Sequence, residues 1–151
     1  MFFWRGMVSL SWCRRQKRGV SLMGGKPHLS EAYLKDAYDS LKVCLSSEGK
    51  WKVITGYYAC YNALYSILMK CGIKSEIHEC TIKLMKLFGF SEKEIEFLEK
   101  LKRDRVQGQY YLKKVNLIGV VDVKKFILRC EEILNSLNED MIKEIRRKLD
   151  E

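Results

Sequence analysis

Pro27 is the only proline in the 151-residue chain, so residues 28 to 151 contain no residue that must end a helix. Hydrophobic residues make up 47% of the sequence, which is enough for a packed core, and the length fits one ordinary domain rather than two. We therefore expect an all-α protein. Because short connections separate segments of comparable length, we expect an antiparallel up-and-down bundle of four to five helices.

Apolar residues recur at three- and four-residue spacing in five segments after Pro27. The expected helices span 31–46, 51–71, about 75–88, a segment that begins near Ser91, and 122–149, the last as one helix or as two with a break near Asn138. Ser30 is expected to cap the first helix, while Gly72 and Gly89 end the second and third. Ser91 and Glu94 form a capping box at the fourth. The 51–71 helix is apolar on nearly every side, which is typical of a central helix.

The first 29 residues differ from the rest because they carry six basic residues, no acidic residue and no helical or strand period. We expect an unstructured basic head over 1–29 and a helical bundle over 30–151, whose charge is only mildly basic. Arg5 interrupts the apolar start, so the head is not a convincing signal peptide. We interpret residues 1–22 as an upstream extension of the reading frame, with translation starting at Met23. The alternative is a basic arm that binds RNA or acidic lipid.

Six cysteines show no C-x-x-C spacing, and the chain has only two histidines, so no zinc site and no cofactor are expected. Cys44, Cys60 and Cys130 fall on apolar stripes, where a free thiol behaves as a small hydrophobe. A reduced, cytoplasmic protein is the expectation. No stretch of 18 or more apolar residues is present, so we expect no membrane partner.

The stretch KRDRVQGQYY, residues 102–111, combines two arginines, two glutamines and two tyrosines at the end of the fourth segment. Arg105 continues the apolar stripe four residues after Leu101, so it should face the core and need a carboxylate partner or a second subunit. Arg103 and Tyr110 are seven residues apart and should share an exposed face suited to a phosphate and its ribose or base. The alternative is that Arg103 is a solvated surface arginine.

The segment GYYACYNALYSILMKCGIKSEIHECTIKLM, residues 56–85, resembles the second and third helices of HEPN-domain proteins. The tyrosine-rich helix, the KCGIKS turn and the following His78 carry this resemblance, which extends over roughly 30–135. The chain is most similar to the stand-alone branch of the family, related to HEPN proteins encoded beside a minimal nucleotidyltransferase. The resemblance implies a small helical bundle that forms a homodimer.

The family's functional motif is an arginine followed by a polar residue, then a histidine four to six positions later, then a tyrosine two beyond it. Arg103, Asp104 and Tyr110 match the arginine, the polar residue and the tyrosine, whereas Gly108 occupies the histidine position. In a second register Arg105 is the motif arginine and Tyr110 stands where the histidine is expected. Similar active proteins are metal-independent endoribonucleases, in which histidine exchanges a proton with the ribose 2′-hydroxyl, and glycine cannot do this.

The resemblance therefore implies a binding module rather than a strong catalyst: a partner of a minimal nucleotidyltransferase in a toxin–antitoxin or defence-type pair. The residues expected to bind RNA or nucleotide are Arg103, Asp104, Arg105, Gln107, Gln109, Tyr111 and His78. Tyr110 is the implied acceptor of a transferred AMP. The alternative is an endoribonuclease with Arg103, Arg105 and Tyr110 in a degenerate site across a homodimer. A third hypothesis is a nucleotide or small-ligand binding protein, although the sequence contains no P-loop or G-x-G-x-x-G.

Overall fold

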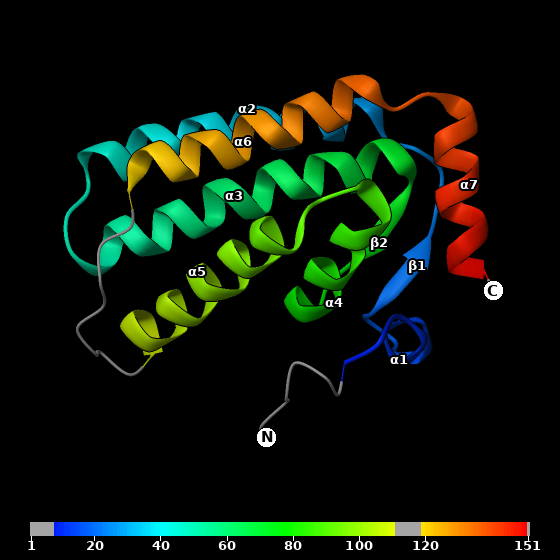
Figure 1. The fold of residues 1–151 in the computed structure, drawn as a ribbon, viewed down its shortest axis with the longest axis horizontal. Coiled ribbons are helices and arrows are strands. Elements are labelled where there is room, and N and C mark those ends of the chain that lie inside the picture. The colour runs from blue at the N-terminus through cyan, green and yellow to red at the C-terminus, as the bar shows by residue number, and fades with distance from the viewer. Residues whose placement is uncertain (1–7, 111–118, 151) are drawn as a thin grey trace.

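The computed structural model describes residues 8–110 and 119–150. Its elements, in chain order, are α1 (Leu10–Arg15), β1 (Val20–Leu22), α2 (Pro27–Ser46), α3 (Lys50–Cys71), β2 (Ile73–Ser75), α4 (His78–Lys83), the 3₁₀ helix η2 (Leu84–Phe88), α5 (Glu92–Tyr110), α6 (Val120–Ser136) and α7 (Glu139–Asp150). The predicted all-α class is confirmed, since the strands are three residues each. Four long helices, α2, α3, α5 and α6, alternate in direction along the chain, and α7 stands across one end (Figure 1).

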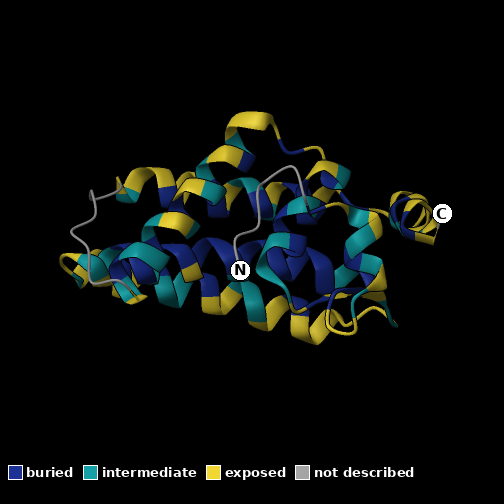
Figure 2. Cartoon of the chain, turned by 90° about the horizontal axis from the view of Figure 1, so that it is seen from below, coloured by how far each residue is buried: buried dark blue, intermediate teal, exposed yellow. Residues whose placement is uncertain are grey.

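Helix α3 is the centre of the bundle, as its all-round apolar character predicts. It packs against α2, α5 and α6, and most of its residues from Val53 onward are buried. Figure 2 shows this buried core running through the middle of the molecule, with exposed residues on the outer faces of the surrounding helices. Gly72 ends α3 in the left-handed conformation, with φ at 71°. A Cβ there would lie 2.3 Å from the Met23 carbonyl oxygen, so only glycine fits.

Several predicted helix ends are confirmed by hydrogen bonds. At the start of α5, the Glu94 amide donates to Ser91 Oγ at 3.2 Å and the Ser91 amide donates to Glu94 Oε1 at 2.8 Å. The predicted break near Asn138 separates α6 from α7, and Asn138 Oδ1 accepts from the Met141 amide at 2.9 Å. The first long helix begins at Pro27 instead of being capped by Ser30. Ser30 is buried and donates to the Ser66 carbonyl of α3 at 2.7 Å, so its hydroxyl serves helix packing.

The helix predicted over 75–88 is divided into β2, α4 and η2. β2 pairs with β1 in an antiparallel arrangement in which Val20 is opposite Ser75 and Leu22 is opposite Ile73. The sequence pattern could not reveal this division because the strand is fixed by its pairing with a distant segment rather than by its own period. Gly89 ends the segment as predicted, with φ at 84°.

The prediction that residues 1–29 are unstructured and outside the core is wrong for the part the structure describes. Val8, Cys13 and Val20 are buried, and a disulfide joins Cys13 of α1 to Cys80 of α4. The cross-link and the pairing of β1 with β2 hold this region in place, so it folds without the long apolar period that would have predicted its structure. This disulfide also contradicts the expectation of a fully reduced protein. Cys44, Cys60 and Cys130 are free and buried, as predicted.

Within the described residues, no helix is long and apolar enough to cross a membrane.

Candidate functional site

Near the end of α5, Arg103 and Arg105 lie on different sides of the helix, as the helical spacing predicts. Arg103 is exposed, while Arg105 lies on the buried stripe after Leu101 and keeps only 7% of its surface exposed. Gly108 is also buried, so the histidine position of the family motif faces the core here. Asp104 forms an ion pair with Lys100 at 2.9 Å and is not paired with Arg105.

Tyrosine rings surround the Arg105 guanidinium. Its central carbon lies 4.9 Å from the ring centroid of Tyr57, 5.5 Å from that of Tyr58 and 5.9 Å from that of Tyr110. These distances are in the range of favourable cation–π contacts. Nη1 donates to the Tyr58 hydroxyl at 3.2 Å and to Gln109 Oε1 at 3.4 Å. Tyr110 therefore accompanies Arg105, although its spacing predicted a pairing with Arg103.

The positive charge of Arg105 has no carboxylate partner among the described residues, and its buried Nε–H has no hydrogen-bond acceptor there. The buried Oε1 of Gln107 also lacks a donor. A buried cation that is neither paired nor fully hydrogen-bonded is costly, because it has lost its hydration without an equivalent replacement. Arg105 is therefore the strongest candidate anion-binding group in the described structure. Its planar N–H donors match the oxygens of a phosphate or carboxylate.

His78, at the start of α4, lies in the same cluster, although it precedes Arg105 by 27 residues in the sequence. Its Nδ1 is 2.6 Å from the Tyr57 hydroxyl, and its ring stacks on Tyr61 with the centroids 4.1 Å apart. Tyr57 thus contacts the guanidinium with its ring and the imidazole with its hydroxyl. Burial lowers the pKa of His78 to about 4, and the positive charges of Arg105 and Lys102 act in the same direction. His78 is consequently neutral near pH 7.

An ion pair between Glu79 and Lys102 joins α4 to α5 beside His78. Sequence reasoning missed Glu79, Lys102, Tyr57 and Tyr58 as members of the site. The available signal was the tyrosine pair in GYYACY, but tyrosines in a central, largely apolar helix are also typical of a core. Of the predicted binding residues, the structure gathers Arg105, Gln109, Tyr110 and His78. Arg103 is exposed, Asp104 and Gln107 are half-buried on α5, and Tyr111 is outside the described residues.

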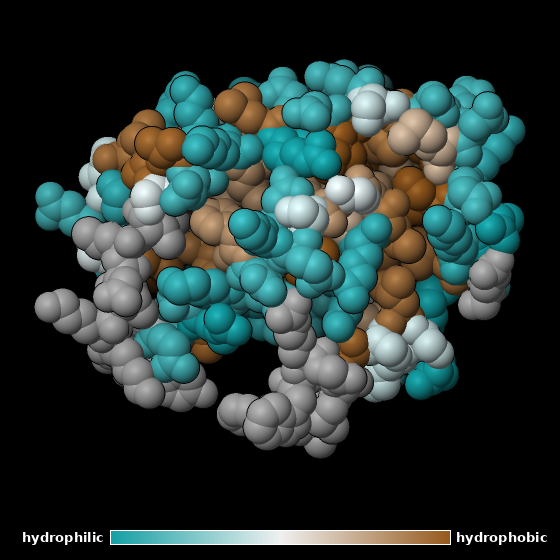
Figure 3. All heavy atoms as spheres, viewed as in Figure 1, coloured by the Kyte–Doolittle hydropathy of each residue, from teal (hydrophilic) through white to brown (hydrophobic). Residues whose placement is uncertain are grey.

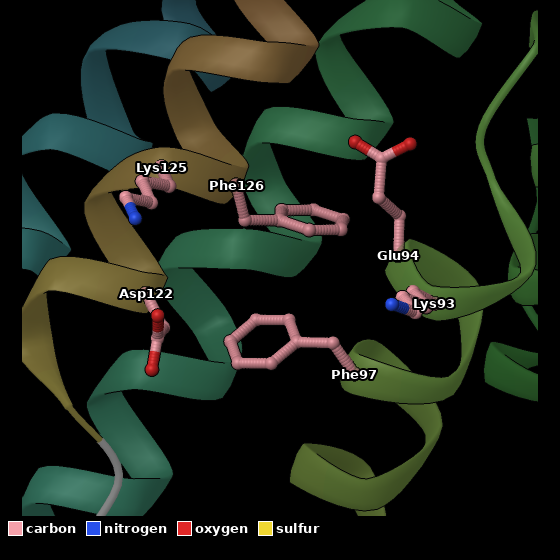
Figure 4. A pocket seen from close by; sticks show the side chains of 6 residues that line it. All are labelled: Lys93, Glu94, Phe97, Asp122, Lys125 and Phe126. Carbon is pink, nitrogen blue, oxygen red and sulfur yellow. The ribbon is translucent and has the colours of Figure 1, made fainter.

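A separate hollow, with a volume of about 280 Å³, lies between the start of α5 and the start of α6, away from Arg105. In Figure 4, Phe97 and Phe126 point into it, with Lys93 and Glu94 on the α5 side and Asp122 and Lys125 on the α6 side. The two rings are 5.9 Å apart, and Glu94 is paired with Arg129 at 3.2 Å. This hollow lacks a buried, unpaired polar group, which distinguishes it from the surroundings of Arg105.

The described residues contain no group of three or more histidine, cysteine or acidic side chains arranged to hold a metal ion. No protein-family model matches the chain, and no curated protein is significantly similar to it in sequence.

Proposed function

We propose that this chain is a HEPN-like cytoplasmic protein that binds the phosphate of RNA or of a nucleotide at Arg105, without strong catalytic activity. The proposal extends to its pairing with a minimal nucleotidyltransferase in a toxin–antitoxin or defence-type system. The observation that carries the binding proposal is the buried Arg105 guanidinium, whose charge and Nε–H are left without a partner among the described residues. A phosphate oxygen supplies both the missing acceptor and the missing negative charge.

Two of the rings around Arg105 are accessible to a ligand. Tyr110 is 64% exposed and Tyr58 is 36% exposed, whereas Tyr57 is fully buried. An exposed aromatic ring beside a phosphate-binding arginine can stack on a base or a ribose, as in proteins that bind single-stranded nucleic acid. The exposed hydroxyl of Tyr110 is also accessible to a nucleotidyltransferase, which supports its proposed role as an acceptor of AMP.

The test is equilibrium binding of AMP and of a short single-stranded RNA to the full chain, compared with Arg105→Gln and Arg103→Gln. The two variants remove the same charge from the same helix, one inside the tyrosine cluster and one outside it. We expect Arg105→Gln to weaken binding at least about tenfold, as expected for the loss of a charge-assisted pair. Arg103→Gln should have a small effect that disappears at high salt. Equal losses in both variants would contradict the proposal, provided that both unfold at the wild-type temperature.

His78 supports a second candidate, a metal-independent endoribonuclease across a homodimer. A neutral imidazole near an arginine provides the two groups that proton transfer and phosphorane stabilisation require. The test is RNA cleavage in EDTA by the wild type and by His78→Gln. Cleavage that disappears in His78→Gln would favour the nuclease, and a wild type that binds RNA without cleaving it would favour the binding module.

Homodimerisation and the nucleotidyltransferase partner require separate tests. Figure 3 shows hydrophobic residues reaching the surface in separate patches on a largely hydrophilic face. Val121 and Leu128 of α6 are 66% and 47% exposed and, being seven residues apart, share a helical face available to a second copy. Light scattering of the wild type and of Val121→Lys tests the dimer. Copurification with the product of a neighbouring nucleotidyltransferase gene tests the partner.

A further inference from the structure

Helix α4 carries His78 and Glu79 but has only six residues, too few to be stable by itself. Side-chain interactions hold it in place. His78 bonds to Tyr57 of α3, Glu79 pairs with Lys102 of α5, and Thr81 Oγ1 is 3.0 Å from the Tyr61 hydroxyl. A further link is covalent, because Cys80 is joined to Cys13 of α1. The position of the His78 side of the site therefore depends on a bond to the N-terminal region.

The other end of that bond, Cys13, lies in an N-terminal region that is itself held to the rest of the fold. β1, which follows α1, pairs with β2, and Arg14 donates to the Val20 carbonyl at 3.3 Å and pairs with Asp150 of α7 at 3.3 Å. Neither Cys13 nor Cys80 has any exposed surface. A reductant can therefore reach the sulfur atoms only through a local opening of the structure around α1 and α4, and α4 is free to move away from α1 once the bond is cleaved.

We propose that the Cys13–Cys80 disulfide is a redox switch for the Arg105 site: when intact, it ties α4, which carries His78, to α1, and its reduction releases α4 and weakens anion binding. This inference rests on the proposed function, because it concerns the regulation of the same site. In the cytoplasm, where disulfides are characteristically transient and regulatory, reducing systems would act on such a bond. The reaction takes two electrons and two protons from a dithiol, which becomes a disulfide, and leaves Cys13 and Cys80 as thiols.

The experiment compares the full chain in its oxidised form with the same protein reduced by dithiothreitol and then separated from it. Thiol titration and mass determination establish the two states, and AMP affinity and amide hydrogen exchange over residues 78–83 are measured in both. We expect reduction to weaken AMP binding by about fivefold or more, a common size for coupling between two sites. Exchange over 78–83 should accelerate in parallel, because local opening becomes easier.

Two variants complete the test. Cys13→Ser with Cys80→Ser should behave as the reduced protein and be insensitive to dithiothreitol. Cys71→Ser removes a buried cysteine that is not part of the disulfide, and it should keep the full response. Equal affinity in both redox states would overturn the switch while leaving the proposed function intact. Failure to bind AMP in either state would overturn both proposals. Weaker binding without faster exchange over 78–83, or six free thiols under oxidising conditions, would also overturn the switch.

Discussion

Two halves of the same helix use tyrosine in different ways. Toward the end of α3, the Tyr61 hydroxyl is bonded to Thr81, Thr81 is 2.7 Å from Ser75 Oγ, and the Tyr65 hydroxyl accepts from the Ser75 amide at 3.2 Å. One turn earlier, the Tyr57 hydroxyl contacts His78 and the Tyr58 hydroxyl accepts from Arg105. In this cluster the buried Nε–H of Arg105 has no acceptor among the described residues. The hydroxyl groups of the first cluster are paired with one another and with the backbone, whereas the second cluster has an N–H that no described residue accepts. Unsatisfied bonding, rather than residue type, distinguishes a site from a core.

The largest predicted effect is the loss of stability when the disulfide that links α4 to α1 is removed. Helix α4 contributes residues to both tyrosine clusters. Cys13→Ser with Cys80→Ser opens a covalent loop between residues 67 positions apart, and this should lower the free energy of unfolding by about 4 kcal/mol. Urea denaturation of the variant and the wild type under oxidising conditions measures the loss. The same difference should disappear when both are reduced. An unchanged midpoint would mean that α4 is held by its side-chain contacts alone.

The next largest effect is a dependence of the free energy of unfolding on pH, caused by His78. Because its pKa is lowered to about 4 in the folded protein and is about 6.5 when unfolded, the unfolded state binds more protons between these values. The contribution of neutral His78 to the free energy of unfolding is complete above pH 6.5 and is lost as the pH falls toward 4. The full shift corresponds to about 3 kcal/mol, which partial exposure of the ring reduces to about 2 kcal/mol.

The measurement is the unfolding free energy from pH 7.5 to 4 for the wild type and for His78→Gln. The variant should lack the His78 component of the slope, whereas His28→Gln, which removes the chain's other histidine, should retain it. Parallel curves for the wild type and His78→Gln would show that His78 titrates normally and is not enclosed by Tyr57 and Tyr61.

A smaller effect, of opposite sign, is expected for Arg105→Met. Replacing a buried cation that has no carboxylate partner among the described residues by an apolar side chain of similar length should raise the free energy of unfolding by about 1 kcal/mol. The same change should abolish AMP binding. Denaturation and binding measured on one preparation test the two halves of this prediction. A strong loss of stability would mean that the cation–π contacts outweigh the desolvation cost.

The smallest effects separate the two tyrosine clusters. Tyr61→Phe removes a hydroxyl from the closed network and should cost about 1 kcal/mol of stability, with a smaller effect on anion affinity than Tyr58→Phe because Tyr61 does not bond to Arg105. Tyr58→Phe removes a partly exposed hydroxyl and should change stability by less than about 0.5 kcal/mol, while weakening AMP binding because Arg105 loses its position. Thermal unfolding and AMP titration of both variants check this reversal. If the two variants lost stability and AMP affinity to the same extent, the two clusters would not differ in role.

The sequence predicted the long helices because their apolar periods and caps are local signals, as in the Ser91–Glu94 capping box and the Gly72 ending. It also predicted the burial of Arg105 from its spacing after Leu101. It did not predict β1, β2 or the disulfide, because each depends on contact between segments far apart in the chain. The grouping of Tyr57 of α3, His78 of α4 and Arg105 of α5 was not predicted for the same reason.

The most direct test of the central claim observes the Arg105 Nε–H itself. Nitrogen-15 NMR of the oxidised full chain, with the Arg105 resonance assigned by its absence in Arg105→Lys, follows this group as AMP is added. We predict a resonance without a protein acceptor in the free state that shifts with AMP until saturation and then exchanges more slowly with water. A resonance that is already strongly hydrogen-bonded before AMP is added, or that does not respond to AMP, would contradict the assignment of Arg105 as the anion-binding group.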